Sequence, residues 1–243
     1  MGRPVALVTG GGQGIGAATC KRLAEDGYDI LLTYNTSSKP AEMLVDEIRE
    51  SGCDALAVKV DCGNQGEVSL LGIHPWMARK IDVLVLNHGA YNRVAADELT
   101  IDTLRETMAI NFEGAVAVWK AIQPHLSQKA RMVVVGSQLG TRGSPHGADY
   151  SASKAALAVW ARSLAQQVGP EGKRVNILAP GYVDTAILAG DSQQKRAQRE
   201  NEVPLKRVGT PEDMAATIAF LVGDDSAYIT GSIIHVNGGL YLP

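Results

Sequence analysis

The sequence predicts a single α/β domain built on a doubly wound, parallel sheet of seven strands. Short apolar runs alternate along the chain with longer amphipathic segments, which is the pattern that strands and helices leave in such a sheet. The chain has 243 residues, of which 45% are hydrophobic, so it can form one substantial core without staples. No repeat or linker divides it, and we expect one domain over residues 1–243.

The first half of the chain supplies four of the expected strands. These are short apolar runs, typical of strands buried on both faces, at 5–8, 30–34, 56–60 and 81–86. Helices are expected at 17–26, ending at Gly27, and at 41–51. Gly66, Gly72 and Pro75 interrupt the segment 63–80, so we expect a broken or short helix there.

The second half supplies three strands, at 132–135, 175–178 and 233–236. Helices are expected at 101–121, from Tyr150 through 155–168, and at 211–222, while 184–204 is polar and charged. Asn111 lies inside the apolar stripe of the first of these helices. Because an asparagine amide competes for backbone partners, Asn111 has either a polar task or a role in a local kink.

A glycine-rich segment, Thr9-Gly10-Gly11-Gly12-Gln13-Gly14-Ile15-Gly16, joins the first strand to the first helix. Glycines at this turn let the backbone approach a pyrophosphate, and the helix N-terminus turns its free N–H groups and dipole toward that charge. The placement between a strand and a helix therefore predicts a dinucleotide site. A tight turn without a ligand is the alternative.

The end of the second strand bears on which dinucleotide binds. A carboxylate there would pair with the ribose 2′-hydroxyl of NAD, but the segment 33–39 contains no acid. The sequence therefore favours NADPH over NADH, against the alternative of an ordinary polar loop. Gln13 leaves the choice open, since a cation there would have supported a phosphate. Asp61, just past the third strand, is either an adenine contact or a turn or N-cap residue.

Tyr150 and Lys154 are four residues apart in an expected helix, so they lie on one face. A fixed positive charge favours the phenolate, and we expect it to lower the pKa of the phenol from its usual value near ~10. Such a phenol can give a proton to a carbonyl as an alkoxide forms. The same pair also occurs by chance in helices.

Charge, cysteine content and hydrophobicity further limit the functional classes to which the protein can belong. The formal charge of −3 gives no global bias toward nucleic acid or an anionic membrane. Cys20, Cys53 and Cys62 lack metal-ligand spacing and read as reduced thiols. Because no apolar run approaches the ~18 residues of a membrane span, we expect a cytoplasmic protein.

Six motifs now occur in register: Thr9-Gly10-x-x-x-Gly14-x-Gly16, Asn87-x-Gly89, Asn111, Ser137, Tyr150-x-x-x-Lys154 and Pro180-Gly181. Together they resemble the short-chain dehydrogenase/reductases, which have a Rossmann fold, and the likeness covers almost the whole chain. The ending 229–239 is similar to that of the 3-oxoacyl-[acyl-carrier-protein] reductases of bacterial fatty-acid synthesis. Related reductases of sugars, steroids, quinones and small diketones share much of that ending.

The resemblance implies roles for individual residues. Ser137 would bind the carbonyl oxygen, Tyr150 would donate the proton, and Lys154 would lower the tyrosine pKa and hold the nicotinamide ribose. Asn111 would keep its helix kinked around a water that relays protons to Lys154. The implied cofactor-binding residues are Gly10, Gln13, Gly14, Ile15, Gly16, Tyr34, Asn35, Thr36, Ser37, Asp61, Cys62, Asn87, Gly89, Tyr150, Lys154, Pro180, Gly181, Val183 and Thr185.

The implied activity is NADPH-dependent reduction of a 3-oxoacyl thioester, carried by acyl-carrier protein or coenzyme A. Another small alcohol or ketone is the alternative substrate, and an NADP-sensing regulator without turnover is a remote one. We expect a homotetramer and a substrate lid around 184–204. The interrupted segment 63–80 is atypical for the family, whose helix there helps form the tetramer interface.

Three features depart from the family pattern or stay open. His88 replaces a small residue, and we expect its ring to point away from the cofactor. Four cations near the expected active-site mouth, Lys129, Arg131, Lys173 and Arg174, are either a carrier-protein contact or a solvated surface. The stretch 195–199 either binds a phosphate of phosphopantetheine or coenzyme A, or is a mobile charged loop.

Overall fold

The computed structural model describes residues 2–243 and confirms the seven-stranded parallel sheet. The strands are β1 Val5–Val8, β2 Asp29–Tyr34, β3 Ala55–Lys59, β4 Ile81–Leu86, β5 Leu126–Val135, β6 Arg174–Pro180 and β7 Ile233–Val236. Their order across the sheet is β3-β2-β1-β4-β5-β6-β7, and every neighbouring pair is parallel. The direction of winding reverses between β1 and β4, which is where ligands bind in sheets of this type.

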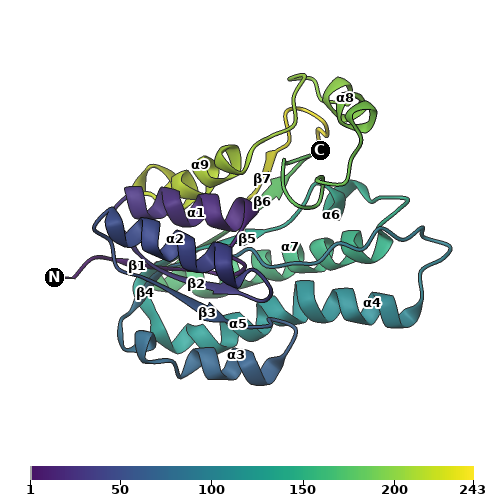
Figure 1. Cartoon of the computed structure of the whole chain (residues 1–243). Helices are drawn as coiled ribbons and strands as arrows, with labels where there is room; N and C mark the ends of the chain where they lie inside the picture. The colour runs from purple at the N-terminus through teal and green to yellow at the C-terminus, as the bar shows by residue number, and fades with distance from the viewer. Residues whose placement is uncertain (1) are drawn as a thin grey trace.

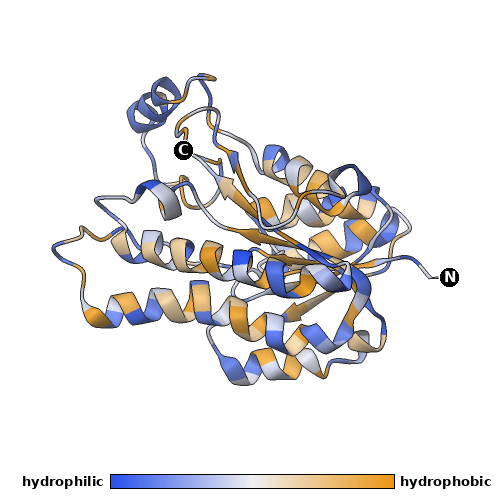
Figure 2. Ribbon diagram, turned by 180° about the vertical axis from the view of Figure 1, so that it is seen from behind, coloured by the Kyte–Doolittle hydropathy of each residue, from blue (hydrophilic) through white to orange (hydrophobic). Residues whose placement is uncertain are grey.

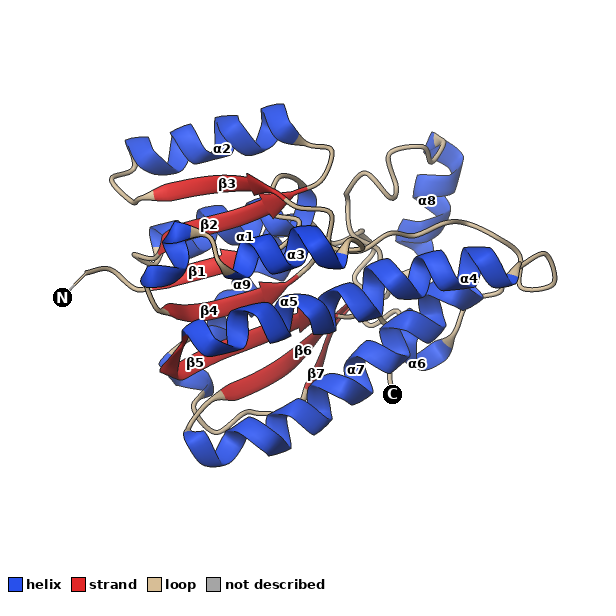
Figure 3. Cartoon of the chain, turned by 90° about the horizontal axis from the view of Figure 1, so that it is seen from below, coloured by secondary structure: helices blue, strands red, loops and turns tan. Residues whose placement is uncertain are grey.

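Helices cover both faces of the sheet, as Figures 1 and 3 show. One layer contains α1 Gly14–Glu25, α2 Ser38–Glu50 and α9 Pro211–Val222, and the other contains α3 Gln65–Gly72, α4 Ile101–Met108, α5 Gly114–Ile122 and α7 Ala148–Val168. Each layer has its own core, because successive strand side chains point to opposite faces. Leu7 of β1 packs with the α5 and α7 layer, whereas Ala6 and Val8 pack with the α1 and α9 layer.

The hydropathy colouring of Figure 2 shows the same arrangement from behind. The strands are largely hydrophobic and enclosed, whereas α8, Gln193–Glu202, is almost entirely hydrophilic and stands away from the sheet. No helix within residues 2–243 is both long enough and apolar enough to cross a bilayer.

The predicted elements are confirmed with shifts at their ends. β1, β4, β7 and α9 have the predicted bounds, and the expected broken helix is α3 followed by a 3-10 turn at Pro75–Ala78. The long helix predicted at 101–121 is divided into α4 and α5 by a π-helical turn, Ala109–Glu113, which contains Asn111. A π turn bulges the backbone by one residue, and such bulges are frequent at functional sites.

Two helices were not predicted. α6, Leu139–Arg142, is a single turn and too short for a periodic pattern. α8 lacks an apolar stripe, and its start is fixed locally by the Ser192 hydroxyl, which accepts a hydrogen bond from the backbone N–H of Lys195 at 3.2 Å. Neither helix leaves the hydrophobic period on which prediction depends.

Candidate active site

A pocket of about 650 Å³ opens at the carboxyl ends of the strands, on the side where the winding reverses. Residues at or after the ends of the first six strands, β1 to β6, line it, together with the start of α7. Of the residues predicted for the site, all but Gly16 and Asn111 lie in its wall. The sequence motifs therefore converge on one cavity.

The glycine-rich turn forms one end of this pocket. Gly10 and Gly14 have φ of 62° and 52°, in the left-handed region that favours glycine. A Cβ on Gly16 would lie 2.2 Å from the carbonyl oxygen of Gly10, so only glycine allows α1 to begin this close to β1. Gln13, the N-cap of α1, makes no side-chain cap bond, and the first turn has no acid. The free N–H groups of that turn suit an anion.

The ends of β2 and β3 form the neighbouring wall. Tyr34, Asn35, Thr36 and Ser37 line the pocket, and α2, which begins just after them, has no acid in its first turn. The Asp61 carboxylate accepts a hydrogen bond from the backbone N–H of Gly63 at 2.9 Å, so it shapes the turn after β3. Burial raises the pKa of the neighbouring Cys62 thiol to about 12.

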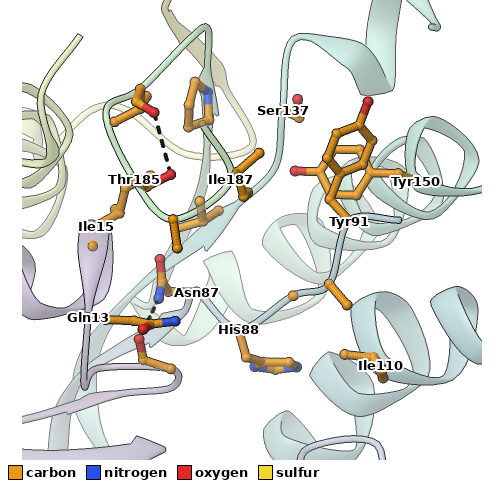
Figure 4. A pocket seen from close by; sticks show the side chains of 18 of the residues that line it. Gln13, Ile15, Asn87, His88, Tyr91, Ile110, Ser137, Tyr150, Thr185 and Ile187 are labelled. Carbon is orange, nitrogen blue, oxygen red and sulfur yellow. Dashed lines mark hydrogen bonds between the residues drawn. The ribbon is translucent and has the colours of Figure 1, made fainter. Parts of the chain in front are cut away.

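Ser137, Tyr150 and Lys154 lie together at the other end, as predicted (Figure 4 labels the first two). Lys154 is 3% exposed, and its Nζ donates to the carbonyl oxygen of Val135 at 2.8 Å. The same Nζ lies 5.6 Å from the centroid of the Tyr150 ring, so the pair shares one face of α7. Burial lowers the pKa of Lys154 to about 8.

The predicted lowering of the Tyr150 pKa was wrong for this structure. Burial raises the pKa of the phenol to about 12, and the Ser137 hydroxyl opposes that rise only in part. The ammonium of Lys154 is held by Val135 rather than by the phenol oxygen, and the cost of placing a phenolate in a desolvated site is the larger effect. Tyr150 is therefore a protonated group at neutral pH.

Asn111 lies behind the pocket wall and is fully buried. Its Oδ1 accepts from the N–H of Ala90 at 2.7 Å, and its Nδ2 donates to the carbonyl of Ala90 at 2.9 Å and to Ser153 Oγ at 3.0 Å. Both readings of the sequence thus hold: Asn111 lies in a kinked turn, and its amide has a polar task. It ties the segment after β4 to the helix that carries Tyr150.

His88 is held through its ring by Thr9, just after β1, and the expectation that the ring points away from the cofactor stays a prediction. His88 lies in the pocket wall beside Ile110 (Figure 4), with its Nδ1 2.7 Å from Thr9 Oγ1. Its Nε2 is buried without a hydrogen-bond partner in the described chain. Burial, and then the charge of Lys154, lower the pKa of the imidazole to about 3. A neutral ring fits this place because it adds no second charge near Lys154.

Several residues of the pocket were missed in the sequence. Tyr91, Gln138, Leu139, Tyr182, Ile187 and Leu188 line the end that contains Ser137 and Tyr150. They belong to no motif, but each lies within a few residues of a predicted site residue, on the loops after β4, β5 and β6. Proximity to a strand end was the one available signal, and it does not say which loop residues turn inward.

The four cations proposed for a carrier protein lie at the wrong end of the sheet. Arg131 pairs with Val83 in the β4–β5 ladder and with Arg174 at the start of β6, far from the carboxyl ends of these strands. Arg174 is 7% exposed and donates to three backbone carbonyls, and Lys173 forms an ion pair with Glu171. Residues that precede a strand of a parallel sheet lie at the end of the sheet opposite the pocket.

The basic stretch 195–199 belongs to α8 and makes internal ion pairs. Arg196 binds the Asp184 carboxylate at 2.7 and 3.1 Å. Arg199 pairs with Asp191, lies over the ring of Tyr182, and lines the pocket. Both guanidinium groups already have carboxylate partners, and Arg199 places α8 at the border of the pocket.

Comparison with known proteins places the chain among oxidoreductases. A family model described as enoyl-(acyl carrier protein) reductase matches residues 10–241. A 3-oxoacyl-[acyl-carrier-protein] reductase of Staphylococcus aureus is 33% identical over 241 residues, 98% of each chain. A cyclohexanol dehydrogenase of Rhodococcus is 36% identical over 261 residues, covering 97% of this chain and 95% of that protein.

Solved structures agree with this comparison. A short-chain dehydrogenase from Burkholderia cenocepacia in complex with NADP is 37% identical, with a TM-score of 0.91 over 98% of this chain and 97% of that one. A blue fluorescent protein from a metagenomic library, in complex with NADPH, is 34% identical, with a TM-score of 0.92 over 98% of both chains. The likeness extends over the full sheet and both helical layers.

Proposed function

Because the chain belongs to the short-chain dehydrogenase/reductase family of NAD(P)-dependent oxidoreductases, we propose that it reduces the 3-keto group of a 3-oxoacyl thioester with NADPH. One observation carries the proposal: Ser137, Tyr150 and Lys154 share a pocket with a glycine-rich helix N-terminus. A proton donor and a nucleotide cradle therefore face one cavity.

The chain's own residues fit a phosphorylated dinucleotide. Gly10, Gly14 and Gly16 leave the space beside the N-terminus of α1 that a pyrophosphate needs. The wall from Tyr34 to Ser37 offers hydroxyls, an amide and no carboxylate, which suits a 2′-phosphate. The remaining contacts in this proposal are Gln13, Ile15, Asp61, Cys62, Asn87, Gly89, Pro180, Gly181, Val183 and Thr185.

In the proposed reaction, NADPH bound in this pocket would supply the hydride that the carbonyl carbon takes up. The Ser137 hydroxyl donates a hydrogen bond to the carbonyl oxygen and stabilises the charge that develops there. Tyr150, protonated at neutral pH, then gives its proton to that oxygen, and the product is a 3-hydroxy group. Lys154 places a positive charge beside the phenolate that remains, while Asn111 holds the backbone around both groups.

Two relatives with similar identity to this chain suggest different substrates. The Staphylococcus aureus relative acts on a 3-oxoacyl group, and its likeness covers the whole chain. The Rhodococcus relative is named for cyclohexanol and is similar to the same extent, so a simple alcohol or ketone is the second candidate. The apolar side chains Leu139, Ile187 and Leu188 of the pocket are compatible with either.

We also propose a cytoplasmic homotetramer with the segment 184–204 as a substrate lid. β7 is a sheet edge, and Phe220 of α9 and Tyr228 beside it are exposed, as is Val159 on the outer face of α7. An unprotected edge with exposed aromatic residues is a favourable contact for a second copy. Light scattering after size exclusion would give the number of subunits.

The test is the initial rate of NADPH and NADH oxidation with acetoacetyl-coenzyme A, with Tyr150→Phe as the blank. We expect NADPH-selective turnover that is lost in the variant, while the variant binds NADPH as the parent does. If the parent ignores this thioester but oxidises cyclohexanol efficiently, the 3-oxoacyl assignment fails and the second candidate replaces it. If Tyr150→Phe keeps most activity, the assignment of the proton donor fails.

A further inference from the structure

Gln138 places a buried amide without a partner in the wall of the active-site pocket. The residue is 2% exposed, directly follows Ser137, and lines the cavity. Its Oε1 has no hydrogen-bond partner within residues 2–243. Its backbone is fixed, because its N–H donates to the carbonyl of Pro180 at 3.0 Å and its own carbonyl accepts from Thr141 and Arg142 at 3.1 and 3.0 Å. The backbone of Gln138 is therefore fixed, while its side-chain oxygen has no bond within the described residues.

A buried amide of this kind is unfavourable. Leaving one buried polar group unpaired costs about 1–3 kcal/mol, and an apolar side chain of the same shape would avoid that cost. Leu139, Ile187 and Leu188 show that this end of the pocket accommodates aliphatic side chains. A glutamine here thus destabilises the free protein and becomes favourable only when a bound molecule supplies the missing partner.

The position defines what that partner is. Ser137, the preceding residue, binds the reacting carbonyl oxygen in the proposed function, and Gln138 lines the same cavity, so a substrate held by Ser137 would have its neighbouring atoms close to the Gln138 amide. A half-turn about the last side-chain bond exchanges the amide oxygen and the NH₂ group, so Gln138 can present a donor. A second carbonyl oxygen on the substrate would accept from it.

We propose that Gln138 is a specificity-determining residue that donates a hydrogen bond to a second carbonyl of the substrate, two carbons from the reacting one. The inference rests on the proposed function and narrows its substrate to 1,3-dicarbonyl compounds. A 3-oxoacyl thioester has this second oxygen, whereas a simple ketone lacks it. A site built to hydrogen-bond such a group discriminates strongly against analogues without it.

The test varies Gln138 in the enzyme and the second carbonyl group in the substrate. Ethyl acetoacetate and 2-hexanone are compared as substrates of the parent, of Gln138→Leu and of Gln138→Glu, with NADPH saturating. We expect Gln138→Leu to lower kcat/KM for the keto ester by roughly 10–100-fold, the size of one lost hydrogen bond in a buried site, and to change it less than about threefold for the ketone. Gln138→Glu, which has no N–H, should lose at least as much.

Binding and stability provide independent readouts. Calorimetric titration of both compounds into protein loaded with NADP⁺ should show the same selective loss in Gln138→Leu, even where turnover is slow. The ligand-free Gln138→Leu protein should melt at the same temperature as the parent or higher, because the unpaired amide is gone. A melting temperature several degrees lower would show that the amide has a structural partner, and the proposal would fail.

Failure of this proposal is distinguishable from failure of the proposed function. A parent that ignores acetoacetyl-coenzyme A but prefers ethyl acetoacetate to 2-hexanone, with the preference lost in Gln138→Leu, overturns the thioester and supports Gln138. Equal losses on both compounds, or a parent that prefers 2-hexanone, overturn the role of Gln138 and leave the family's chemistry at Tyr150 intact.

Discussion

The ring of Tyr91 meets the ring of Tyr150 edge-on, with the centroids 4.8 Å apart and the planes at 60°. The Tyr91 hydroxyl donates to the carbonyl of His146 at 2.8 Å, just before α7 begins. A Cβ on Gly147 would lie 2.5 Å from Cε2 of Tyr91, so the aromatic ring occupies the place of a side chain there. The loop after β4 is thereby locked to the helix that carries Tyr150.

Gly147→Ala should therefore break this lock. We expect the variant to lose about 1–3 kcal/mol from the overpacked contact, together with a fall in kcat, because the new methyl group displaces Tyr91 from Tyr150. Denaturant unfolding and steady-state rates measure both effects. Gly143→Ala is the matched control: Gly143 has φ of 75°, but a Cβ there meets nothing within 4 Å. Adding Tyr91→Ala to Gly147→Ala should recover part of the lost stability, and an additive double variant would contradict the coupling.

The sequence predicts the sheet and the nucleotide end of the site well, for a physical reason. Buried parallel strands are continuous apolar runs, and the glycine-rich turn allows few alternatives, since Gly16 must approach Gly10 closely. Tyr150 and Lys154 are neighbours by helical geometry alone. These features depend on local chain geometry, which the order of residues determines directly.

The substrate end depends on contacts between distant segments, and the sequence alone does not show them. Tyr91 and Gln138 enter the pocket because loops after β4 and β5 fold toward α7, and no periodic pattern marks which loop residues turn inward. The predicted direction of the Tyr150 pKa shift was wrong for a related reason. Helical spacing brings Lys154 near Tyr150, but the degree of desolvation depends on the whole pocket.

Lys154 should destabilise the folded protein at neutral pH. Its pKa is about 8 in the folded chain, against 10.5 for a lysine side chain in water, so the unfolded state holds more protons between these values and stability rises with pH across that window. The difference corresponds to about 3 kcal/mol below pH 8. Lys154→Met should thus unfold at a higher temperature than the parent at pH 7 while losing activity. The advantage should shrink by more than half at pH 9.5, and a constant advantage would contradict the explanation.

His88 should make the protein sensitive to mild acid. Its pKa is lowered from 6.5 to about 3, so the unfolded state gains a proton first as the pH falls. The free energy of unfolding that depends on neutral His88 is therefore fully present above pH 6.5 and falls progressively as the pH approaches 3. Between pH 7 and 5 this amounts to about 2 kcal/mol. Denaturant unfolding of His88→Ala should show a pH dependence weaker by that amount. His146→Ala, which removes an exposed histidine, is the matched control, and equal changes in both variants would exclude His88 as the cause.

Arg174 should act on stability and leave substrate binding unchanged. Its guanidinium donates to the carbonyls of Leu221, Gly223 and Ile229 at 2.9 to 3.1 Å, which fixes the end of α9 to the start of β6. Arg174→Met leaves these carbonyls without their donor, and we expect a loss of about 2–4 kcal/mol in the free energy of unfolding. Because Arg174 lies at the end of the sheet opposite the pocket, KM of Arg174→Met for an acyl-carrier-protein thioester should stay within about twofold of the parent. Lys129 is exposed at the same end, so Lys129→Met should change neither the free energy of unfolding nor KM. A large rise in KM with normal stability in Arg174→Met would restore the carrier-binding role that its buried position argues against.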